Sequence, residues 1–327
     1  MYKALRKLPN FRTIERKRMV PMLLKPRPIP QELLLLRTLS PRMLLPEELM
    51  DHLIILEKGY EGELKFDAIV DNHKNNYVII RDLLLEYSQS EFQLDNLLLT
   101  PKGIYQLEVK NFEGEHSIEN DTWYASSGTK IKNPLLQLKR SENLLSQLLY
   151  KMKANMKVHS LLVFVNTEFT LYGSSQNMPI ILPSQINKLF TNLNRDYEGD
   201  NFITPRLKAI SNQLVKLHKN ESSYNRIPEY NYHLLKKGLV CSHCYSWMIK
   251  SMQGRLECPS CNKEENYSSA IQRSINELTL LFPNIILTAG TLFEWCGDII
   301  SRKTIQRFLS EKYKMNGRGK SAFYERV

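Results

Sequence analysis

The sequence predicts an α/β fold in which helices sandwich a mixed β-sheet, followed by a small zinc ribbon and an α-helical module of a DNA-binding type. Three observations support this prediction. Apolar, strand-like runs between residues 77 and 109 have helical patterns before and after them, four cysteines form two Cys-x2-Cys pairs, and a basic helical pattern follows them. Strands with helices on both sides pack as a sheet between helical layers.

The composition narrows the class of partner. The chain has 327 residues, enough for two or three domains with their own cores. Lys and Arg number 45 against 34 Asp and Glu, which gives a net charge of +11. This excess favours a polyanionic partner, either nucleic acid or an anionic membrane surface. No apolar run approaches the ~20 residues that span a bilayer, and no secretory signal is recognisable. We therefore expect a cytoplasmic protein that binds nucleic acid and no membrane.

Residues 1–46 form a basic, proline-rich N-terminal arm. They hold seven of the fifteen prolines, and residues 1–27 contain nine Lys or Arg against one acid, Glu15. Two interpretations stay open. Because charge runs are usually only solvated, the first is a solvated arm or an irregular wrap around the domain. The sharper interpretation is a basic arm that follows a phosphate backbone.

Residues 47–184 form the predicted sheet domain. A helix begins at Pro46, whose first turn carries Glu47 and Glu48, as helix N-termini favour. The following elements are expected from apolar alternation, turn residues and helical periodicity. They are strands at Tyr77–Leu85, Phe92–Leu99 and Gly103–Val109, a hairpin at Ser117–Ala125, a helix from Asn133 to about Met156, and a strand at His159–Val165.

One turn in this region gathers charge on an apolar element. Asp95 lies near the start of one strand, a Pro-Lys-Gly turn follows, and the next strand ends with Glu108 and Lys110. In an antiparallel hairpin, the start of one strand lies beside the end of its partner, so Asp95 should approach both residues. Glu108 and Lys110 also share a face, because side chains two apart on a strand point the same way.

This set of charges is typical of a metal site. A lone carboxylate among leucines is unfavourable, so Asp95 needs either a metal or a cation, and Lys110 alone is the structural alternative. Carboxylates suit Mg²⁺ (or Mn²⁺), which is held by one or two of them together with water and phosphate. The chemistry that needs such a set is metal-assisted phosphodiester hydrolysis, with Lys110 orienting or activating the attacking water.

Four blocks in this order resemble the nuclease-related domain (NERD) of the PD-(D/E)XK restriction-endonuclease-like superfamily. The resemblance covers residues 55–170 and implies a restriction-endonuclease-like core. The blocks are Gly59-Tyr60-Glu61-Gly62-Glu63, the Asp95 hairpin, Glu108-Val109-Lys110-Asn111-Phe112-Glu113-Gly114 and Asn133-Pro134-Leu135-Leu136-Gln137.

The resemblance implies further site residues. Glu63, on the helix ahead of the hairpin, would assist the metal or its water shell, although a helix Glu is ordinarily only solvated. Gln137 would face the site and position a phosphate or a water, with an ordinary polar helix residue as the alternative. The metal itself would be held by Asp95, Glu108 and the carbonyl of Val109.

Residues 185–237 are predicted to be a polar, mostly helical connector, and residues 238–265 a zinc ribbon. Tetrahedral Zn²⁺ takes four thiolates, and two Cys-x2-Cys pairs separated by 13 residues are close to the zinc-ribbon spacing. We therefore predict one structural Zn²⁺. Its ligands would be Cys241, Cys244, Cys258 and Cys261.

Residues 266–327 are predicted to be a helix-turn-helix-like basic module. A short helix at 291–296, a tight Gly-containing turn and a longer helix from Ser301 have this arrangement, with Ser301 as N-cap. Eight Lys or Arg accompany two acids between residues 302 and 327. On the last helix, the polar side chains that would meet DNA are Arg302, Lys303, Gln306 and Arg307.

Together these parts predict a metal-dependent nuclease with DNA-binding C-terminal modules, suited to DNA processing or to defence against foreign DNA. The alternative is a non-catalytic nucleic-acid-binding or regulatory protein that uses the nuclease fold as a scaffold. RNA as the target is a third interpretation. The sequence leaves open endo- or exonucleolytic action and the oligomeric state.

Overall fold

The computed structural model describes residues 22–73, 77–195, 203–251, 255–317, 319 and 322–326. The chain forms two compact units: unit 1 comprises residues 1–27 and 61–220, and unit 2 comprises residues 28–60 and 221–327. Of the predicted N-terminal arm, positions 1–21 lie outside the described residues. The division of the sequence into five segments stays a prediction.

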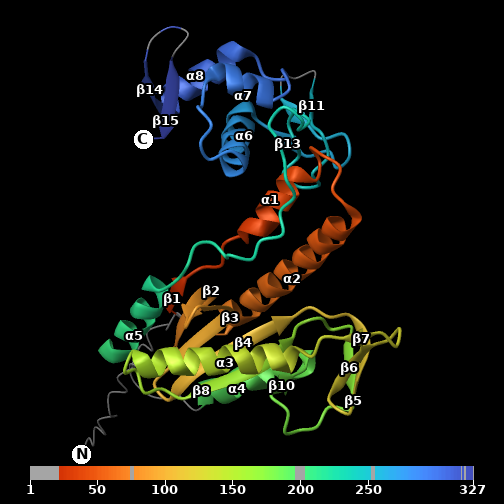
Figure 1. Cartoon of the computed structure of the whole chain (residues 1–327), viewed down its shortest axis with the longest axis vertical. Coiled ribbons are helices and arrows are strands. Elements are labelled where there is room, and N and C mark those ends of the chain that lie inside the picture. The colour runs from red at the N-terminus through yellow and green to blue at the C-terminus, as the bar shows by residue number, and fades with distance from the viewer. Residues whose placement is uncertain are drawn as a thin grey trace, which may run out of the picture. The chain divides into compact units, whose positions relative to one another are not determined.

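A six-stranded mixed sheet forms the centre of unit 1 (Figure 1), with the strand order β1-β2-β3-β4-β8-β10. The strands are β1 (Met22–Lys25), β2 (Val78–Tyr87), β3 (Ser90–Thr100), β4 (Gly103–Lys110), β8 (Val158–Phe164) and β10 (Ile180–Ile181). β2, β3 and β4 pair antiparallel, whereas β1 adds to β2, β8 to β4 and β10 to β8 in parallel. Because the sheet is covered on both faces, these strands are apolar along most of their length.

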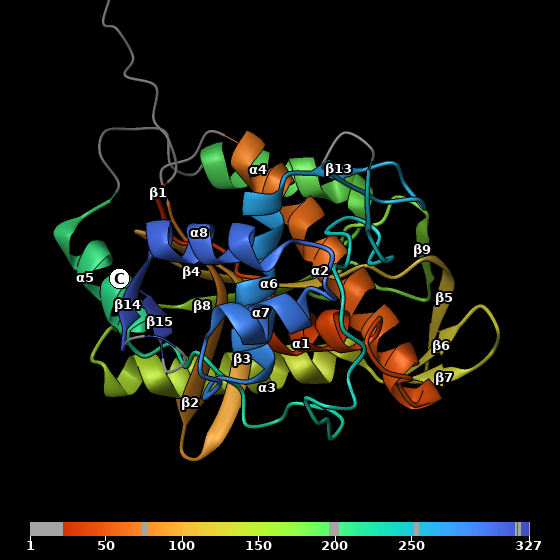
Figure 2. The ribbon, with the colours of Figure 1, turned by 90° about the horizontal axis from the view of Figure 1, so that it is seen from above.

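Helices cover both faces of this sheet, and Figure 2 shows α3 and α4 on opposite sides of the strands. The helices of unit 1 are the second part of α2 (Glu47–Asn72), α3 (Pro134–Lys151), α4 (Ile186–Arg195), which follows a 3-10 turn at Pro183–Gln185, and α5 (Pro205–Lys216). α3 and α5 share a core with Val78 and Ile80 of β2. α2 and α4 share another core with Ile79, through Phe66 and Phe190. Alternate residues of one strand thus serve the two faces.

A second, smaller sheet with the order β7-β6-β5-β9 completes unit 1. Its strands are β5 (Gly114–Glu119), β6 (Thr122–Ala125), β7 (Lys130–Ile131) and β9 (Phe169–Tyr172). Trp123 and Phe169 of this sheet pack with Phe164 of β8 and Leu138 of α3.

Unit 2 combines short strands, helices and a terminal hairpin around one core. Its elements are α1 (Gln31–Leu39), the first part of α2, the three-stranded sheet β11 (Ile249–Lys250), β12 (Leu256–Glu257) and β13 (Glu264–Glu265), the helices α6 (Tyr267–Leu281), α7 (Ala289–Trp295) and α8 (Arg302–Lys312), and the hairpin β14 (Tyr313–Asn316) and β15 (Phe323–Arg326). The core joins Leu36, Cys258, Ile271, Trp295 and Leu309.

The predicted fold class, a mixed sheet between helices, is confirmed. The strands predicted between residues 77 and 109 are present as β2, β3 and β4. The predicted helix to about Met156 instead ends at Lys151, because Lys153 and Asn155 have positive φ angles, which a right-handed helix cannot continue. Among the described residues, no helix has both the length and the apolar character needed to cross a bilayer.

Candidate functional site

The candidate site lies where β3 separates from β4. Their antiparallel pairing ends with Asn96 opposite Leu107. At the next position of β3, a side chain takes the place of the hydrogen bond between the strands. The Oδ2 of Asp95 accepts the Val109 N–H at 2.8 Å. The pairing of β3 with β2 is also interrupted here, at Asp82, whose φ is +51°. The backbone around Asp95 is therefore available to partners other than neighbouring strands.

Two of the predicted site residues, Lys110 and Gln137, bind Glu108. Its Oε1 accepts hydrogen bonds from Lys110 Nζ at 2.9 Å and from Gln137 Nε2 at 2.6 Å. Lys110 Nζ also donates to Gln137 Oε1 at 3.3 Å, which closes a triangle of three side chains. Gln137 reaches this triangle from the first turns of α3, whose N-cap is Asn133, and it is itself exposed. The structure thus brings the three residues together, while their chemical roles stay predictions.

Burial strongly affects the charges of this group. Asp95 is 8% exposed and Glu108 only 1%. Desolvation, followed by repulsion from Glu108 and Glu63, raises the pKa of Asp95 well above its ordinary value. Desolvation opposes the charge of Lys110 as well, but Glu108 and Asp95 outweigh it and raise the pKa of the ammonium. The lysine is therefore cationic at neutral pH. Its single positive charge does not fully compensate the two buried carboxyl groups, Asp95 and Glu108.

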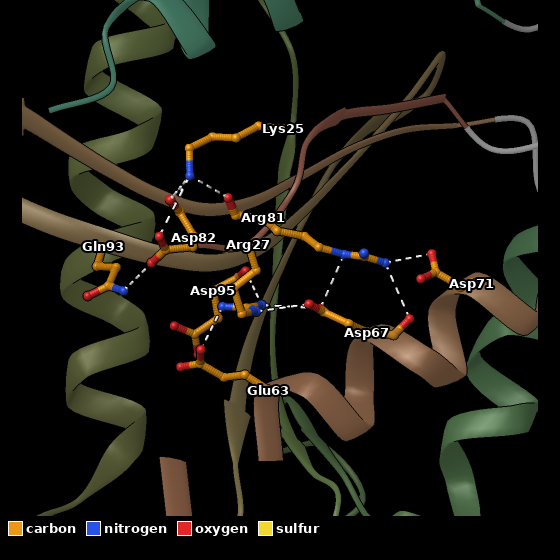
Figure 3. Close-up of polar contacts among 9 residues, drawn as sticks. All are labelled: Lys25, Arg27, Glu63, Asp67, Asp71, Arg81, Asp82, Gln93 and Asp95. Carbon is orange, nitrogen blue, oxygen red and sulfur yellow. Dashed lines mark hydrogen bonds and ion pairs between the residues drawn. The ribbon is translucent and has the colours of Figure 1, made fainter. Parts of the chain in front are cut away.

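Helix α2 adds two acids to the same region. Glu63 and Asp67 are four residues apart and so share a helix face, and both bind Arg27 (Figure 3). Desolvation is the main cause that raises the pKa of Glu63 to about 7, and the Arg27 guanidinium partly offsets it. Glu63 thus lies in the cluster that the sequence predicts for it.

Arg27 and Asp67 belong to this cluster and are absent from the sequence prediction. Spacing is the signal that could have identified Asp67, because a helix that directs Glu63 toward the hairpin also directs the residue four positions later. Arg27 belongs to the predicted basic arm, where neither interpretation places it in the domain interior. Its side chain is nevertheless 1% exposed.

The donor set fits a hard divalent cation. Glu108 Oε2 is buried and has no hydrogen-bond partner among the described residues. An ionised oxygen in such a place is unfavourable unless a cation binds it. Carboxylate oxygens are the donors that Mg²⁺ and Mn²⁺ prefer. Val109 contributes its N–H to Asp95, and its carbonyl as a metal ligand stays a prediction.

The four predicted zinc ligands converge in unit 2. One ligand atom from each of Cys241, Cys244, Cys258 and Cys261 lies within 4.8 Å of all the others. The sulfurs of Cys241 and Cys261 are 3.7 Å apart, and those of Cys244 and Cys258 are 3.4 Å apart. Four thiols at one point fit tetrahedral Zn²⁺.

The two Cys-x2-Cys turns share a backbone conformation at the residue that follows each pair. This shared conformation explains why their thiols lie on one side. The residue after each pair, Tyr245 or Asn262, has a positive φ of 58° or 57°. Its N–H donates to the carbonyl of the first cysteine, at 3.1 Å for Cys241 and 2.8 Å for Cys258. Each turn therefore closes in the same way and presents two sulfurs on one side.

The last helix has the predicted amphipathic arrangement. Ile305, Phe308 and Leu309 are buried, and Ser301 Oγ accepts the Thr304 N–H at 3.2 Å as the N-cap. The predicted outward residues Arg302, Lys303, Gln306 and Arg307 are all exposed. The hairpin of β14 and β15 follows α8 directly. Nucleic-acid binding by this helix stays a prediction, and its residues belong to unit 2, whereas the carboxylate cluster belongs to unit 1.

Comparison with known proteins identifies one part of the chain. Residues 58–165 match the model of the nuclease-related domain (NERD), and this match indicates a nuclease-related function for the segment. Glu63, Asp95, Glu108, Lys110 and Gln137 all lie within the matched range. No curated protein and no solved structure has a significant match to the chain.

Proposed function

We propose, with the NERD domain of residues 58–165 as the premise, that unit 1 hydrolyses phosphodiester bonds with a divalent metal ion. Glu108 Oε2 is the observation that supports this most directly. A buried carboxylate oxygen without a partner among the described residues, close to the buried Asp95, is what a cation site requires.

Asp95 and Glu108, with the carbonyl of Val109, would hold Mg²⁺ or Mn²⁺. When bound, such an ion supplies Lewis-acid polarisation of a phosphoryl oxygen and neutralises charge. Asp95 is prepared for this role because its Oδ2 is fixed by the Val109 N–H, which leaves Oδ1 to bind elsewhere. Glu108 is prepared likewise, because Lys110 and Gln137 bind only its Oε1.

Lys110 would act on the substrate as an oriented hydrogen-bond donor. An ammonium has three N–H groups, and two of them are directed to Glu108 and Gln137. The third can reach a phosphate oxygen or the attacking water, and the positive charge stabilises negative charge that develops during hydrolysis. Gln137 would help to orient the same water or phosphate, and Glu63 would act on the water shell of the ion.

We further propose that α8 binds DNA. Its exposed Arg302, Lys303 and Arg307 are suited to phosphate contacts, and Gln306 to a base edge. The net charge of +11 supports a polyanionic partner for the whole chain.

The nuclease proposal is tested by incubating the purified full chain with plasmid DNA, linear DNA and RNA, in Mg²⁺, Mn²⁺ or EDTA. We expect cleavage of DNA that needs the metal. Asp95→Asn or Glu108→Gln should lower the rate at least ~100-fold, and Lys110→Met by a similar factor, which is typical of losing one electrostatic catalytic group.

The matched control is Glu61→Gln, an exposed acid on α2 two residues before Glu63. This variant should cleave like the parent. Asp95→Asn removes a buried charge whose pKa is raised in the folded chain, so its melting temperature in EDTA should not fall. Parent-level cleavage by Asp95→Asn would overturn the site. Nucleic-acid binding without any cleavage by the parent would instead assign the non-catalytic role.

A further inference from the structure

Arg27 is a buried cation that the proposed chemistry does not use. Figure 3 shows its guanidinium between Asp67 and Glu63, beside Asp95. Nη1 donates to Glu63 Oε2 at 2.7 Å, and Nε and Nη2 donate to the two Asp67 oxygens at 2.9 and 3.2 Å. Nη2 also donates to the Asp95 carbonyl at 2.8 Å. One guanidinium therefore binds two helix carboxylates and the backbone of β3 at the point where the strand ladder is interrupted.

The local sequence presents Arg27 in a fixed direction. Pro26 and Pro28 flank it, and a proline restricts both its own backbone and that of the preceding residue. Two residues earlier, Lys25 ends β1, and its Nζ donates to the Asp82 carbonyl at 2.5 Å and lies 3.6 Å from Asp82 Oδ2. The parallel pairing of β1 with β2 thus places Arg27 at the acid cluster.

The balance of charges shows what Arg27 leaves for a metal. The carboxylates of this region are Glu63, Asp67, Asp71, Asp82, Asp95 and Glu108. The cations that contact them are Lys25, Arg27, Arg81 and Lys110. The Asp71 side chain is 52% exposed, so solvent screens its charge. When ionised, the other five carboxylates against four cationic side chains leave one negative charge. One divalent ion would more than offset it, and no buried charge is left over for a second ion.

The individual oxygens agree with this count. Both oxygens of Asp67 are bound by Arg27, and Arg81 Nε lies 3.2 Å from one of them. A cation between Asp67 and Glu63 would therefore have to displace the guanidinium. The partnerless oxygen Glu108 Oε2 belongs to β4 instead.

We propose that the Arg27 guanidinium takes the place of a second cation, so that the site holds one divalent ion, at Asp95 and Glu108. This inference rests on the proposed function and deepens it to a reaction with a single ion. It also assigns Arg27, outside the matched NERD segment, to the architecture of the metal site. Arg27→Gln removes one positive charge and frees Glu63 and Asp67 for a second ion. Arg27→Lys retains the charge and should retain one ion.

The test counts bound Mn²⁺ on the purified full chain from the loss of the free-ion signal in electron paramagnetic resonance. Zinc is measured separately by elemental analysis, so that the cysteine site does not enter the count. We expect one Mn²⁺ in the parent and in Arg27→Lys, and two in Arg27→Gln. The control is Arg140→Gln, an exposed arginine of α3 that donates to the Glu91 carbonyl, and it should bind one.

The ion counts test the role of Arg27 and the metal-dependent function separately. Two ions in the parent, or one ion in a folded Arg27→Gln chain, overturn the role of Arg27. No ion in the parent overturns the proposed metal-dependent function itself. If Arg27→Gln does not fold, as circular dichroism would show, the count in the parent decides between one ion and two.

Discussion

At the scale of single residues, unit 1 uses side chains to complete backbone hydrogen bonding beside its strands. His218 Nδ1 accepts the Leu84 N–H at 3.1 Å, and the next residue, Lys219, donates its N–H to the Leu84 carbonyl at 2.9 Å. Desolvation, with Lys25 nearby, lowers the pKa of His218 below its ordinary value. The fold therefore favours the neutral ring, because a protonated Nδ1 cannot accept a hydrogen bond.

His218 should make the stability of unit 1 depend on pH. Its pKa is lower in the folded chain than in the unfolded one, so its contribution is present above the unfolded value of about 6.5 and is lost as the pH falls through the folded value. We expect His218→Gln to gain stability relative to the parent as the pH falls from about 7 to about 5. Urea unfolding of both proteins across this range measures the difference.

The control for this prediction is His233→Gln, which removes an exposed histidine of unit 2. Its unfolding curve for unit 1 should follow the parent at every pH. If the difference in the free energy of unfolding between His218→Gln and the parent stays constant across the pH range, His218 does not titrate with folding.

The predictability of site residues depends on how local their contacts are. Asp95, Glu108 and Lys110 were predictable because a short hairpin turn and the alternation of strands determine which side chains meet. Gln137 and Glu63 needed the family resemblance. Arg27 was not predictable, since it meets Asp67 across 40 positions through a parallel strand pair that no local pattern reveals.

At the scale of elements, the four-cysteine cluster of the predicted zinc ribbon shares its core with the helices of unit 2. Cys241 and Cys258 are buried in the same cluster as Leu36 of α1, Ile271 of α6 and Leu309 of α8. The candidate metal site is therefore part of the unit's interior, and we expect that loss of a bound ion would affect more than the ribbon.

We predict that Cys258→Ser loses zinc and destabilises α6, α7 and α8 together with β11, β12 and β13. Ligand loss removes binding free energy that contributes directly to folding. Elemental analysis and hydrogen exchange of the α6 amides measure the two effects. The control is Cys296→Ala, a buried cysteine outside the four-sulfur group, which should keep its zinc. If the α6 amides of zinc-free protein are as protected from hydrogen exchange as those of the parent, loss of zinc destabilises only the ribbon.

Elements were predictable where apolar periodicity is strong, and their ends were not. β2, β3 and β4 follow from their alternation, whereas the end of α3 depends on the positive φ of Lys153 and Asn155. Lysine does not ordinarily indicate such a conformation, so a sequence pattern extends the helix too far.

At the scale of the whole molecule, the chain passes between the two units after Arg27, Tyr60 and Asn220. The sequence predicts a helix only from Pro46 and assigns residues 28–46 to the N-terminal arm, so it does not predict helix α1 at Gln31–Leu39 or the core that this helix joins. The structure places α1 in the core of unit 2, while α4 and α5 of the predicted connector pack on the sheet of unit 1. Candidate catalytic and candidate DNA-binding residues thus belong to different units.

This separation predicts that affinity and catalysis can be changed independently. Neutralising Arg302, Lys303 and Arg307 together should weaken DNA binding and reduce the salt slope by roughly one unit for each lost phosphate contact. The rate of cleavage at saturating DNA should persist, because the carboxylate site is in unit 1. Binding isotherms at several salt concentrations and single-turnover rates measure both.

The matched control neutralises three exposed lysines of α4 and α5, which are Lys188, Lys208 and Lys216. It changes the net charge equally but leaves α8 intact, so a smaller loss of affinity is expected. If the α8 variant binds as tightly as the parent with the same salt slope, the helix is only a packing element.

The position of β1 at one edge of the central sheet has a consequence for shortened chains. The two edges of the central sheet are β1, with four residues, and β10, with two. β2, directly inside β1, has ten residues and is buried along most of them. A chain cut before Pro28 would expose the amide and carbonyl groups of this long apolar strand to other molecules, and such edges promote strand-to-strand aggregation. We therefore expect shortened versions of the protein that lack β1 to self-associate more readily than those that retain it.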